Sequence, residues 1–328
     1  GEKHIKHNLR EVYEICQNFL GTDPTKDFIA VRPAQHYTMG GVRTDPSGQS
    51  PQLKGLFAAG EAACWDMHGF NRLGGNSVAE TVVAGRIVGE SIADFCDDAG
   101  NDVAVPMGLV REFVQREQAH LQGLITGSGS EDASALRIRM QEIMTAQVGI
   151  FRNGRDLQAA VDELQQLLQR SRRIGLRSRD PGANPELVTA YRVQKMLKLA
   201  LCIAYGALTR TESRGAHFRQ DFPRRDDSQW LKRTLARWGG DGDTLPTLGY
   251  EPLDVMAMEL PPGWRGYGAK DYIDHPDTAR RAAEVAAQRE RLAGADRYAV
   301  QRALMPYEHL LPEALRGCNE RIDERFSA

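Results

Sequence analysis

The chain has 328 residues, of which 41% are hydrophobic and 26% charged, and its formal net charge is −2. This length provides a sizeable core and room for two or three substructures. The nearly balanced charge gives no reason to expect nucleic acid as a partner or an attraction to a membrane surface. Because no run reaches the roughly 18 apolar residues of a spanning helix, we expect no direct membrane insertion by this chain.

The cysteines are few and scattered. They form no C-x-x-C pair, so we expect neither a metal site nor iron–sulfur ligation by this chain. Unpaired, dispersed cysteines are typical of a reducing compartment. The five positions are Cys16, Cys64, Cys96, Cys202 and Cys318.

Up to about residue 105 the sequence is rich in glycine and short apolar runs. It predicts a helix over residues 8–20, then buried strands at FIAVRP (28–33) and GLFAAG (55–60). Short apolar runs bounded by glycine are typical of strands in an α/β sheet. We therefore predict an α/β region over residues 1–105.

From residue 106 to 215 the pattern becomes helical and predicts a bundle. The triplet Asn184-Pro185-Glu186 is an N-cap, a proline in the first turn and an early acid, followed by an apolar run through Tyr205. This apolar helix should be the central member of the bundle. Two further apolar stripes are expected in the core: Leu136, Met140, Ile143, Met144 and Phe151, then Leu157, Val161, Leu164 and Leu168.

Residues 216–328 form the third predicted part, a charged and turn-rich extension. GGDGDTLPTLGYEPLD predicts loops and short β pieces, and a helix is expected from Asp277 to Leu292. The fold class expected from the residues is thus α/β plus all-α.

The stretch MHGFNRLGGNSVAETVVAG, Met67 to Gly85, combines a cation, a bare backbone and a helix start. Ser77 and Glu80 fit a capping box, which predicts a helix from Ser77 to about Asp97. The free amides of such an end favour an anion, and the fork of Arg72 matches a carboxylate. On spacing alone, a turn feeding a surface helix with an exposed arginine is an equal alternative.

Two upstream residues could join this site. Glu61 follows a predicted strand, where an acid can accept from sugar hydroxyls, although a solvated strand-end acid is the alternative. His36, in QHYTMGG, could donate to an anionic substrate, although a lone histidine is more often structural.

The series HYTMGG, GLFAAGE and HGFNRLGGNSVAE strongly resembles the flavoprotein subunit of fumarate reductases and succinate dehydrogenases. The resemblance continues through GIFRNG, ANPELVTAYRV and RTESRGAHFRQDFPRRDD. The forms GEAACWDMHGFNRLGGNS and WRGYGAKDYI are most similar to the menaquinol-linked, di-haem fumarate reductases. The resemblance implies that the α/β region is part of an FAD-binding domain.

The resemblance also implies roles for individual residues. His36 and Arg72 would bind a carboxylate of fumarate or succinate and act as the catalytic pair, with Gly75 as a backbone contact to the substrate. The residues implied to lie against FAD are His36, Tyr37, Glu61, Arg72, Leu73, Gly74, Gly75, Asn76, Ser77 and Val78.

The implied reaction is hydride transfer from flavin to fumarate, with proton delivery to the other alkene carbon. The implied partners are an iron–sulfur subunit and a haem-containing membrane anchor subunit. They would place the chain peripherally on the cytoplasmic side of the cell membrane. Fumarate reduction and succinate oxidation share these residues.

The sequence departs from the family in lacking the G-x-G-x-x-G turn that cradles FAD pyrophosphate; GSGSED at Gly127 lacks the third glycine. We interpret the chain as a C-terminal portion that follows the family's capping domain. Alone, it is expected to bind FAD weakly or not at all and to be inactive.

The stretch from Arg210 to Arg233 is dense in both signs of charge. Interleaved acids argue against a nucleic-acid patch and favour a structural ion-pair network, which could border a subunit interface. As an alternative, His217 and Arg214 could assist proton movement.

Two other functions compete with the favoured one. L-aspartate oxidase shares the first motifs, but its usual NRMASNS differs from NRLGGNS here. The other alternative is a non-catalytic docking module with vestigial flavin residues, against which the presence of Arg72, His36 and Glu61 argues.

Overall fold

The computed structural model describes residues 1–31, 33–99, 106–180, 182–240, 242–253, 276–291 and 293–294. The chain forms two compact units, Gly1–His36 and Tyr37–Ala328. The expectations for Leu292, Cys318 and the WRGYGAKDYI stretch lie outside the described residues.

The first unit is a short helical segment. Its helices are α1 (Glu2–Asn8), α2 (Arg10–Ile15) and the π-helix η1 (Cys16–Leu20). The predicted start near Asn8 is wrong, because helix begins at Glu2 and is interrupted at Leu9; the predicted end at Leu20 is confirmed. Gly21 ends the helix with a φ of 63°, a conformation that glycine adopts without steric cost.

The strand predicted at FIAVRP is wrong over its described residues. Phe28 and Val31 are 103% and 89% exposed and belong to no strand. A strand is stabilised by hydrogen bonds to a neighbouring strand and by burial of one face, and these residues have neither in the described structure.

The strand predicted at GLFAAG is also wrong. One antiparallel bridge joins Gln49 and Phe57, and the backbone then turns at Gly60, with φ of 68°, into the 3-10 helix η2 (Gly60–Ala62). The strands of this region are the short parallel pair β1 (Val42–Arg43) and β2 (Ala63–Cys64). The turn at Gly60 limits the ladder to this length.

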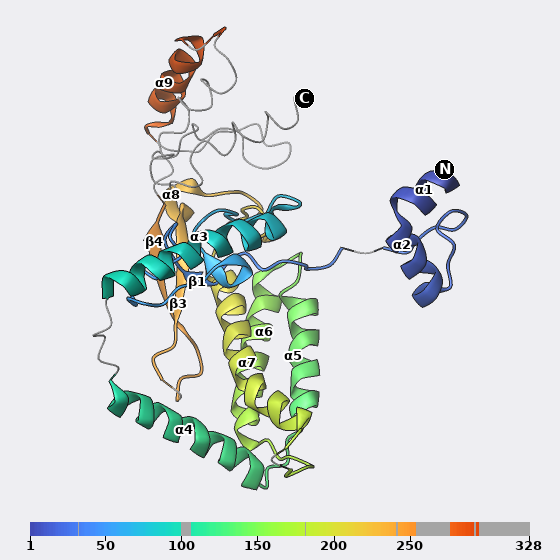
Figure 1. Cartoon of the computed structure of the whole chain (residues 1–328), viewed down its shortest axis with the longest axis vertical. Helices are drawn as coiled ribbons and strands as arrows, with labels where there is room; N and C mark the ends of the chain where they lie inside the picture. Colours follow the sequence, from blue (N-terminus) through green and yellow to red (C-terminus); the bar gives the residue numbers. More distant parts are fainter. Residues whose placement is uncertain are drawn as a thin grey trace. The chain divides into compact units, whose positions relative to one another are not determined.

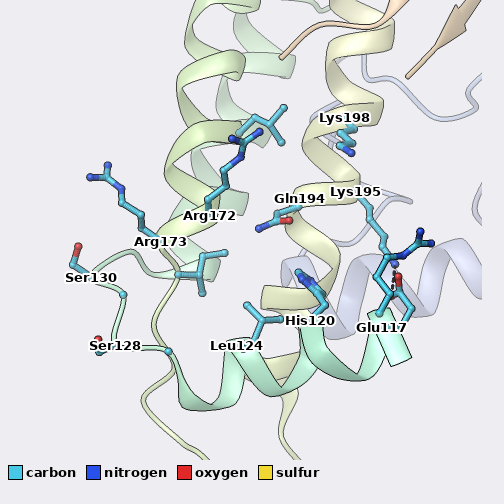
Figure 2. A pocket seen from close by; sticks show the side chains of 16 residues that line it. Glu117, His120, Leu124, Ser128, Ser130, Arg172, Arg173, Gln194, Lys195 and Lys198 are labelled. Atoms are coloured by element: carbon cyan, nitrogen blue, oxygen red, sulfur yellow. Dashed lines mark ion pairs between the residues drawn. The ribbon is translucent and has the colours of Figure 1, made fainter. Parts of the chain in front are cut away.

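Helix α3 (Asn76–Ala99) confirms the helix predicted from Ser77 to Asp97. Helix α4 (Met107–Thr126) contacts α7 (Pro185–Thr209), and its Glu117 and His120 lie beside Lys195 (Figure 2). Tyr191 of α7 donates a hydrogen bond of 2.7 Å to Glu117. This bond ties α4 to the bundle.

The bundle consists of α5 (Ala133–Gln147), α6 (Gly154–Arg170) and α7, which lie side by side (Figure 1). The predicted cap at Asn184 is confirmed, since its Oδ1 accepts from the Leu187 N–H at 3.0 Å. The central place of α7 is also confirmed, because α7 contacts α4, α5 and α6. The 3-10 turn η3 (Ser171–Arg173) follows α6.

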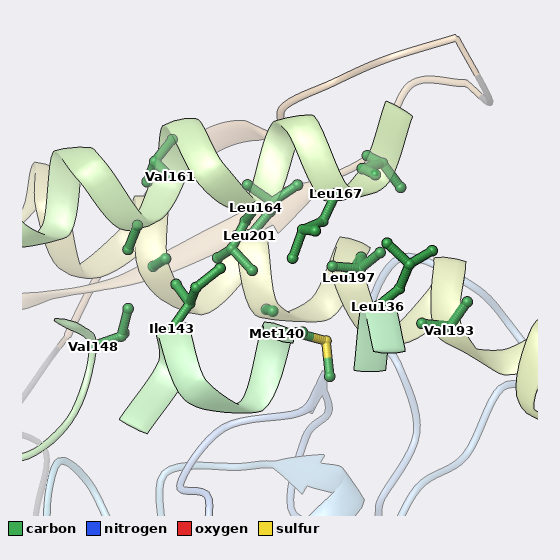
Figure 3. Close-up of a cluster of buried hydrophobic side chains, with 14 of the residues drawn as sticks. Leu136, Met140, Ile143, Val148, Val161, Leu164, Leu167, Val193, Leu197 and Leu201 are labelled. Carbon is green, nitrogen blue, oxygen red and sulfur yellow. The ribbon is translucent and has the colours of Figure 1, made fainter. Parts of the chain in front are cut away.

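Apolar side chains from these helices make one core (Figure 3). The two predicted stripes are confirmed with a single exception: Phe151 is 66% exposed. It follows the end of α5 at Gln147, and its ring packs edge-on against Phe218 instead. The helical periodicity therefore did not apply to it.

The remaining elements are the short helix α8 (Asp227–Trp230), the antiparallel pair β3 (Lys232–Arg237) and β4 (Thr247–Pro252), and α9 (Thr278–Arg291). Register pairs Lys232 with Pro252 and Arg237 with Thr247. The β piece predicted around LGYEP and the late helix are confirmed. No described helix is long and apolar enough to cross a bilayer.

The core predicts a contrast between two leucines on α7. Leu197 is fully buried and Leu199 is 63% exposed. Leu197→Ala should lower the free energy of unfolding by about 2–5 kcal/mol through lost burial and a cavity, and Leu199→Ala should cost far less. Urea unfolding followed by circular dichroism checks this; equal losses in both variants would contradict the core.

Candidate functional site

The predicted capping box at the start of α3 is wrong. The helix begins at Asn76, and Glu80 does not reach back to the helix start. The Glu80 carboxylate instead accepts hydrogen bonds from Trp65 and His68 of the preceding loop and from Tyr37, which lies further upstream. These donors satisfy both carboxylate oxygens, so the spacing of Ser77 and Glu80 fits a cap that the structure does not use.

Glu80 is the centre of a buried polar cluster and is 2% exposed. Its Oε2 accepts from the Tyr37 hydroxyl at 2.7 Å and from His68 Nε2 at 2.6 Å, and its Oε1 accepts from Trp65 Nε1 at 2.8 Å. Burial disfavours the charged form, but these hydrogen bonds outweigh it and lower the pKa of Glu80. Glu80 is therefore a buried, ionised carboxylate.

Tyr37 is fixed by this cluster. Burial, then the hydrogen bond to Glu80, raises the pKa of Tyr37 to about 12, so the phenol remains a donor at neutral pH. Its ring meets the His68 ring edge-on at a centroid distance of 5.3 Å. The face of the Tyr37 ring lies under Arg72, whose Cζ is 5.0 Å from the ring centroid.

Arg72 is half-buried and incompletely satisfied. Its Nη1 donates to the Leu73 carbonyl at 3.1 Å, and its buried Nε has no hydrogen-bond partner in the described part of the chain. A buried donor without an acceptor is costly unless a ligand completes it. The guanidinium is thus positioned by stacking and has capacity for an anion.

The turn after Arg72 leaves its backbone open. Gly75 has a φ of 83°, and a Cβ added at Gly74 or Gly75 would meet no atom within 4 Å. Asn76 and Ser77 are half-buried at the start of α3, and Leu73 and Val78 are 57% and 70% exposed. An open glycine turn leading into a helix N-terminus fits the approach of a flat anionic ring system such as a flavin.

Glu61 lies in η2 and is exposed. Its Oε1 accepts from the Thr38 N–H at 2.8 Å, which connects η2 to the HYTMGG segment. His36 is exposed and is the last residue of the first unit, whereas Arg72 belongs to the second. Their convergence on one carboxylate stays a prediction, as do the other assigned site roles.

Comparison with known proteins identifies the family. A family model described as fumarate reductase flavoprotein C-term matches residues 137–267, and an FAD binding domain model matches residues 1–78. The fumarate reductase flavoprotein subunit of Helicobacter pylori is 46% identical over 99% of this chain, and that of Escherichia coli is 36% identical over 86%. The chain spans about half the length of these relatives, 49% and 46%.

Two solved structures agree. An Escherichia coli quinol fumarate reductase mutant matches 83% of this chain and 45% of its own, with a TM-score of 0.75 and 36% identity. A quinol-fumarate reductase with menaquinol molecules matches 79% and 44%, with a TM-score of 0.72 and 36% identity. The chain belongs to the fumarate reductase and succinate dehydrogenase flavoprotein family. The family expected from the sequence and its FAD cofactor are thereby confirmed.

The mixed helix-and-sheet fold of this flavoprotein resembles that of the fumarate reductase structures. The boundaries predicted at residues 105 and 215 stay predictions. Sequence reasoning did not single out Trp65 and His68, although both lie in the quoted stretch GEAACWDMHGFNRLGGNS. The available signal was that two residues with ring N–H groups, Trp65 and His68, come shortly before Glu80, an acid within the predicted helix.

The flavoprotein's buried arginine network confirms the ion pairs expected between Arg210 and Arg233. Glu212 is fully buried and accepts from Arg210 Nη1 at 2.6 Å and from Arg214 at 2.8 and 2.9 Å. Arg214 also donates to Asp227 at 2.7 Å. Each buried charge here has a partner, as burial requires.

This network contacts Phe70, which lies in the loop between β2 and α3 that also carries Arg72. The Arg210 guanidinium lies over the Phe70 ring at 4.8 Å, and the Ala216 N–H donates to the Phe70 carbonyl at 2.8 Å. Gly215 has a φ of 57°, and a Cβ there would come within 2.9 Å of Phe70 atoms. The glycine is therefore needed for the close approach of the two loops.

His217 lies within the same network as a neutral ring. Its Nδ1 accepts from Arg152 Nη1 at 3.0 Å, and its Nε2 donates to the Arg210 carbonyl at 3.3 Å. Burial, then the charge of Arg152, lowers the pKa of His217 from 6.5 to about 4. A neutral ring at neutral pH favours the structural role over proton movement.

His217 predicts a pH dependence of stability. Between its unfolded pKa of 6.5 and its folded pKa of about 4 the unfolded chain binds more protons, so stability falls as the pH falls through this window. The slope should be at most about 1.4 kcal/mol per pH unit. His217→Gln should flatten the slope in urea unfolding across this window, with exposed His4→Gln as control; an unchanged slope would refute the assignment.

Proposed function

We propose that this chain is part of the flavoprotein subunit of a quinol:fumarate reductase, which reduces fumarate to succinate. The observation that carries the proposal is Arg72, which is stacked on Tyr37 beside an open glycine turn and whose buried Nε has no hydrogen-bond partner among the described residues. This combination suits a small dianion bound against a flat cofactor. It also argues against a docking module with vestigial flavin residues, because no carboxylate of the described residues pairs with Arg72, whereas the structural Arg214 is paired with Glu212 and Asp227.

Arg72 would bind one substrate carboxylate through its fork, with His36 as a second donor and Gly75 as a backbone contact. The Tyr37–Glu80 hydrogen bond holds the ring on which Arg72 is stacked, so the guanidinium is oriented before substrate arrives. Holding both carboxylates of the substrate fixed would polarise and twist the alkene.

The residues that would hold FAD are Glu61, the Arg72–Val78 turn and the HYTMGG segment. When bound, the flavin supplies the hydride that reduces the alkene. The free amides at the start of α3 would favour negative charge on the bound ring system. The Thr38–Glu61 hydrogen bond would keep Glu61 beside the HYTMGG segment.

The partners proposed for the intact protein are an iron–sulfur subunit and a haem-containing membrane anchor. The solved neighbours are quinol fumarate reductases, which supports such an assembly. A position at the cytoplasmic side of the cell membrane through these partners is part of the same proposal.

The role proposed for Arg72 predicts that substitutions lower the rate of fumarate reduction, and that a second cation with a different geometry does not restore it. In the intact subunit, Arg72→Ala should lower kcat/KM for fumarate by about a hundredfold or more, because a paired carboxylate loses its partner. Arg72→Lys should restore little, since an ammonium cannot make the bidentate contact. Reduced-dye assays measure the rates, and flavin absorbance measures cofactor content separately.

The matched control is Arg86→Ala, an exposed arginine on α3 that pairs with Glu90. It should leave fumarate reduction unchanged. Activity retained in Arg72→Ala at full flavin content would overturn the proposed substrate site and favour the docking alternative.

The chain by itself should be inactive. Its sequence has no G-x-G-x-x-G turn for the FAD pyrophosphate, so the purified chain should retain no stoichiometric FAD after gel filtration and should not reduce fumarate with a reduced dye. The intact subunit provides the positive control in the same assay. Retained flavin with turnover would show that the missing turn is dispensable.

A further inference from the structure

A basic pocket lies in the helical part of the molecule, where α4 crosses α7. Its volume is about 920 Å³, within the range of small-molecule sites. Five lysine and arginine side chains line it and Glu117 is the one acid among the described lining residues; Glu131, next to the lining, lies 3.7 Å from Arg173. Neither the substrate site nor the core explains this concentration of charge. We propose that the pocket binds an organic polyphosphate of nucleotide size.

The cations come from separate elements and surround the same space. Figure 2 shows Arg172 and Arg173 on one side, Lys195 and Lys198 on α7, and α4 across the foot of the pocket. Arg116 of α4 also lines it. Because the cations come from three elements, they suit a ligand with several anionic groups. A single small anion could contact the cations of one element but would be too small to bridge all three.

The α4 wall is fixed by specific contacts. Glu117 accepts from the Tyr191 hydroxyl at 2.7 Å and lies 3.9 Å from Lys195 Nζ. His120 packs its ring against Tyr191 at a centroid distance of 5.7 Å. Leu124 is buried in the core of the bundle. The pocket is therefore a defined feature of the fold.

The floor and one end of the pocket differ from its cationic walls. Leu124, Leu168 and Ile174 line it and are 7%, 3% and 5% exposed, which leaves a small apolar patch for the organic part of a ligand. The GSGS loop lines the pocket as well. The backbone N–H groups of Ser128, Gly129 and Ser130 make no hydrogen bond within the described part of the chain, so they are available to phosphate oxygens.

The shape of that loop depends on close backbone packing. A Cβ at Gly129 would come within 2.0 Å of the Arg173 carbonyl oxygen, and a Cβ at Gly175 within 1.9 Å of the Gly129 oxygen. The Glu131 N–H donates to the Arg173 carbonyl at 3.0 Å. The GSGS loop is thus held against η3, which carries two of the cations. The GSGSED stretch lacks the third glycine of a G-x-G-x-x-G turn, but an anion site made of loop N–H groups and neighbouring cations does not need that glycine.

The test uses calorimetric titration of the whole chain with ATP, inorganic triphosphate, adenosine and a hexaglutamate peptide. ATP should bind more tightly than triphosphate, adenosine should not bind measurably, and added salt should weaken the affinity for ATP. No ATP binding, or triphosphate binding equal to ATP, would overturn the proposal. Tighter binding of hexaglutamate would overturn it in favour of an acidic protein partner.

Charge-removing variants locate the site. Arg116→Gln and Lys195→Gln should each weaken ATP binding about tenfold, because each removes a charge-assisted contact. Arg111→Gln is the matched control, since Arg111 is exposed on the same helix and does not line the pocket. Circular dichroism verifies folding of each variant. Equal affinities in all three variants would place ATP elsewhere and refute the assignment.

Discussion

The hydrogen-bonded carboxylate of Glu80 is the interaction on which the candidate site depends. Trp65, His68 and Tyr37 come from segments without long regular elements, and each donates to this one side chain of α3. A buried carboxylate that loses its donors leaves an uncompensated charge, so the loop cannot move away from the helix without a large cost. Two short parallel strands alone could not fix the loop so firmly, because they pair over two residues each.

The same loop is also held by a second set of contacts, at Phe70. Arg210 lies over the ring of Phe70, and the backbone of Ala216 bonds to the Phe70 carbonyl. Between these two attachments the turn at Gly74 and Gly75 is open, because a Cβ added at either glycine would meet no atom within 4 Å. A ligand site benefits from this arrangement, since rigid supports orient the binding groups while the groups themselves remain free for the ligand. The arginine network therefore supports the loop that carries the candidate site through its contacts with Phe70.

Helical features of this chain were predictable because their causes are local. The stripe from Leu157 to Leu168 and the cap at Asn184 depend on spacing within one helix, and both were confirmed. Features that depend on distant partners were not. The position of Glu80 fits a local helix cap, but its carboxylate instead accepts a hydrogen bond from Tyr37, 43 residues away. The residues at FIAVRP have strand composition but no strand beside them in the described structure, and β propensity without a neighbour does not make a strand.

Arg72 and Arg214 differ in how their positive charge is compensated within the fold. Arg214 is buried, and its charge is neutralised by the carboxylates of Glu212 and Asp227, although its Nη1 has no hydrogen-bond partner among the described residues. Arg72 is partly buried as well, yet its contacts are an aromatic face and a backbone carbonyl, neither of which neutralises a cation. A desolvated cation without a carboxylate is unfavourable in the free protein and becomes favourable when an anion binds. The stabilisation that Arg72 lacks in the fold is therefore available to a bound anion, which supports the substrate-binding role proposed for this residue.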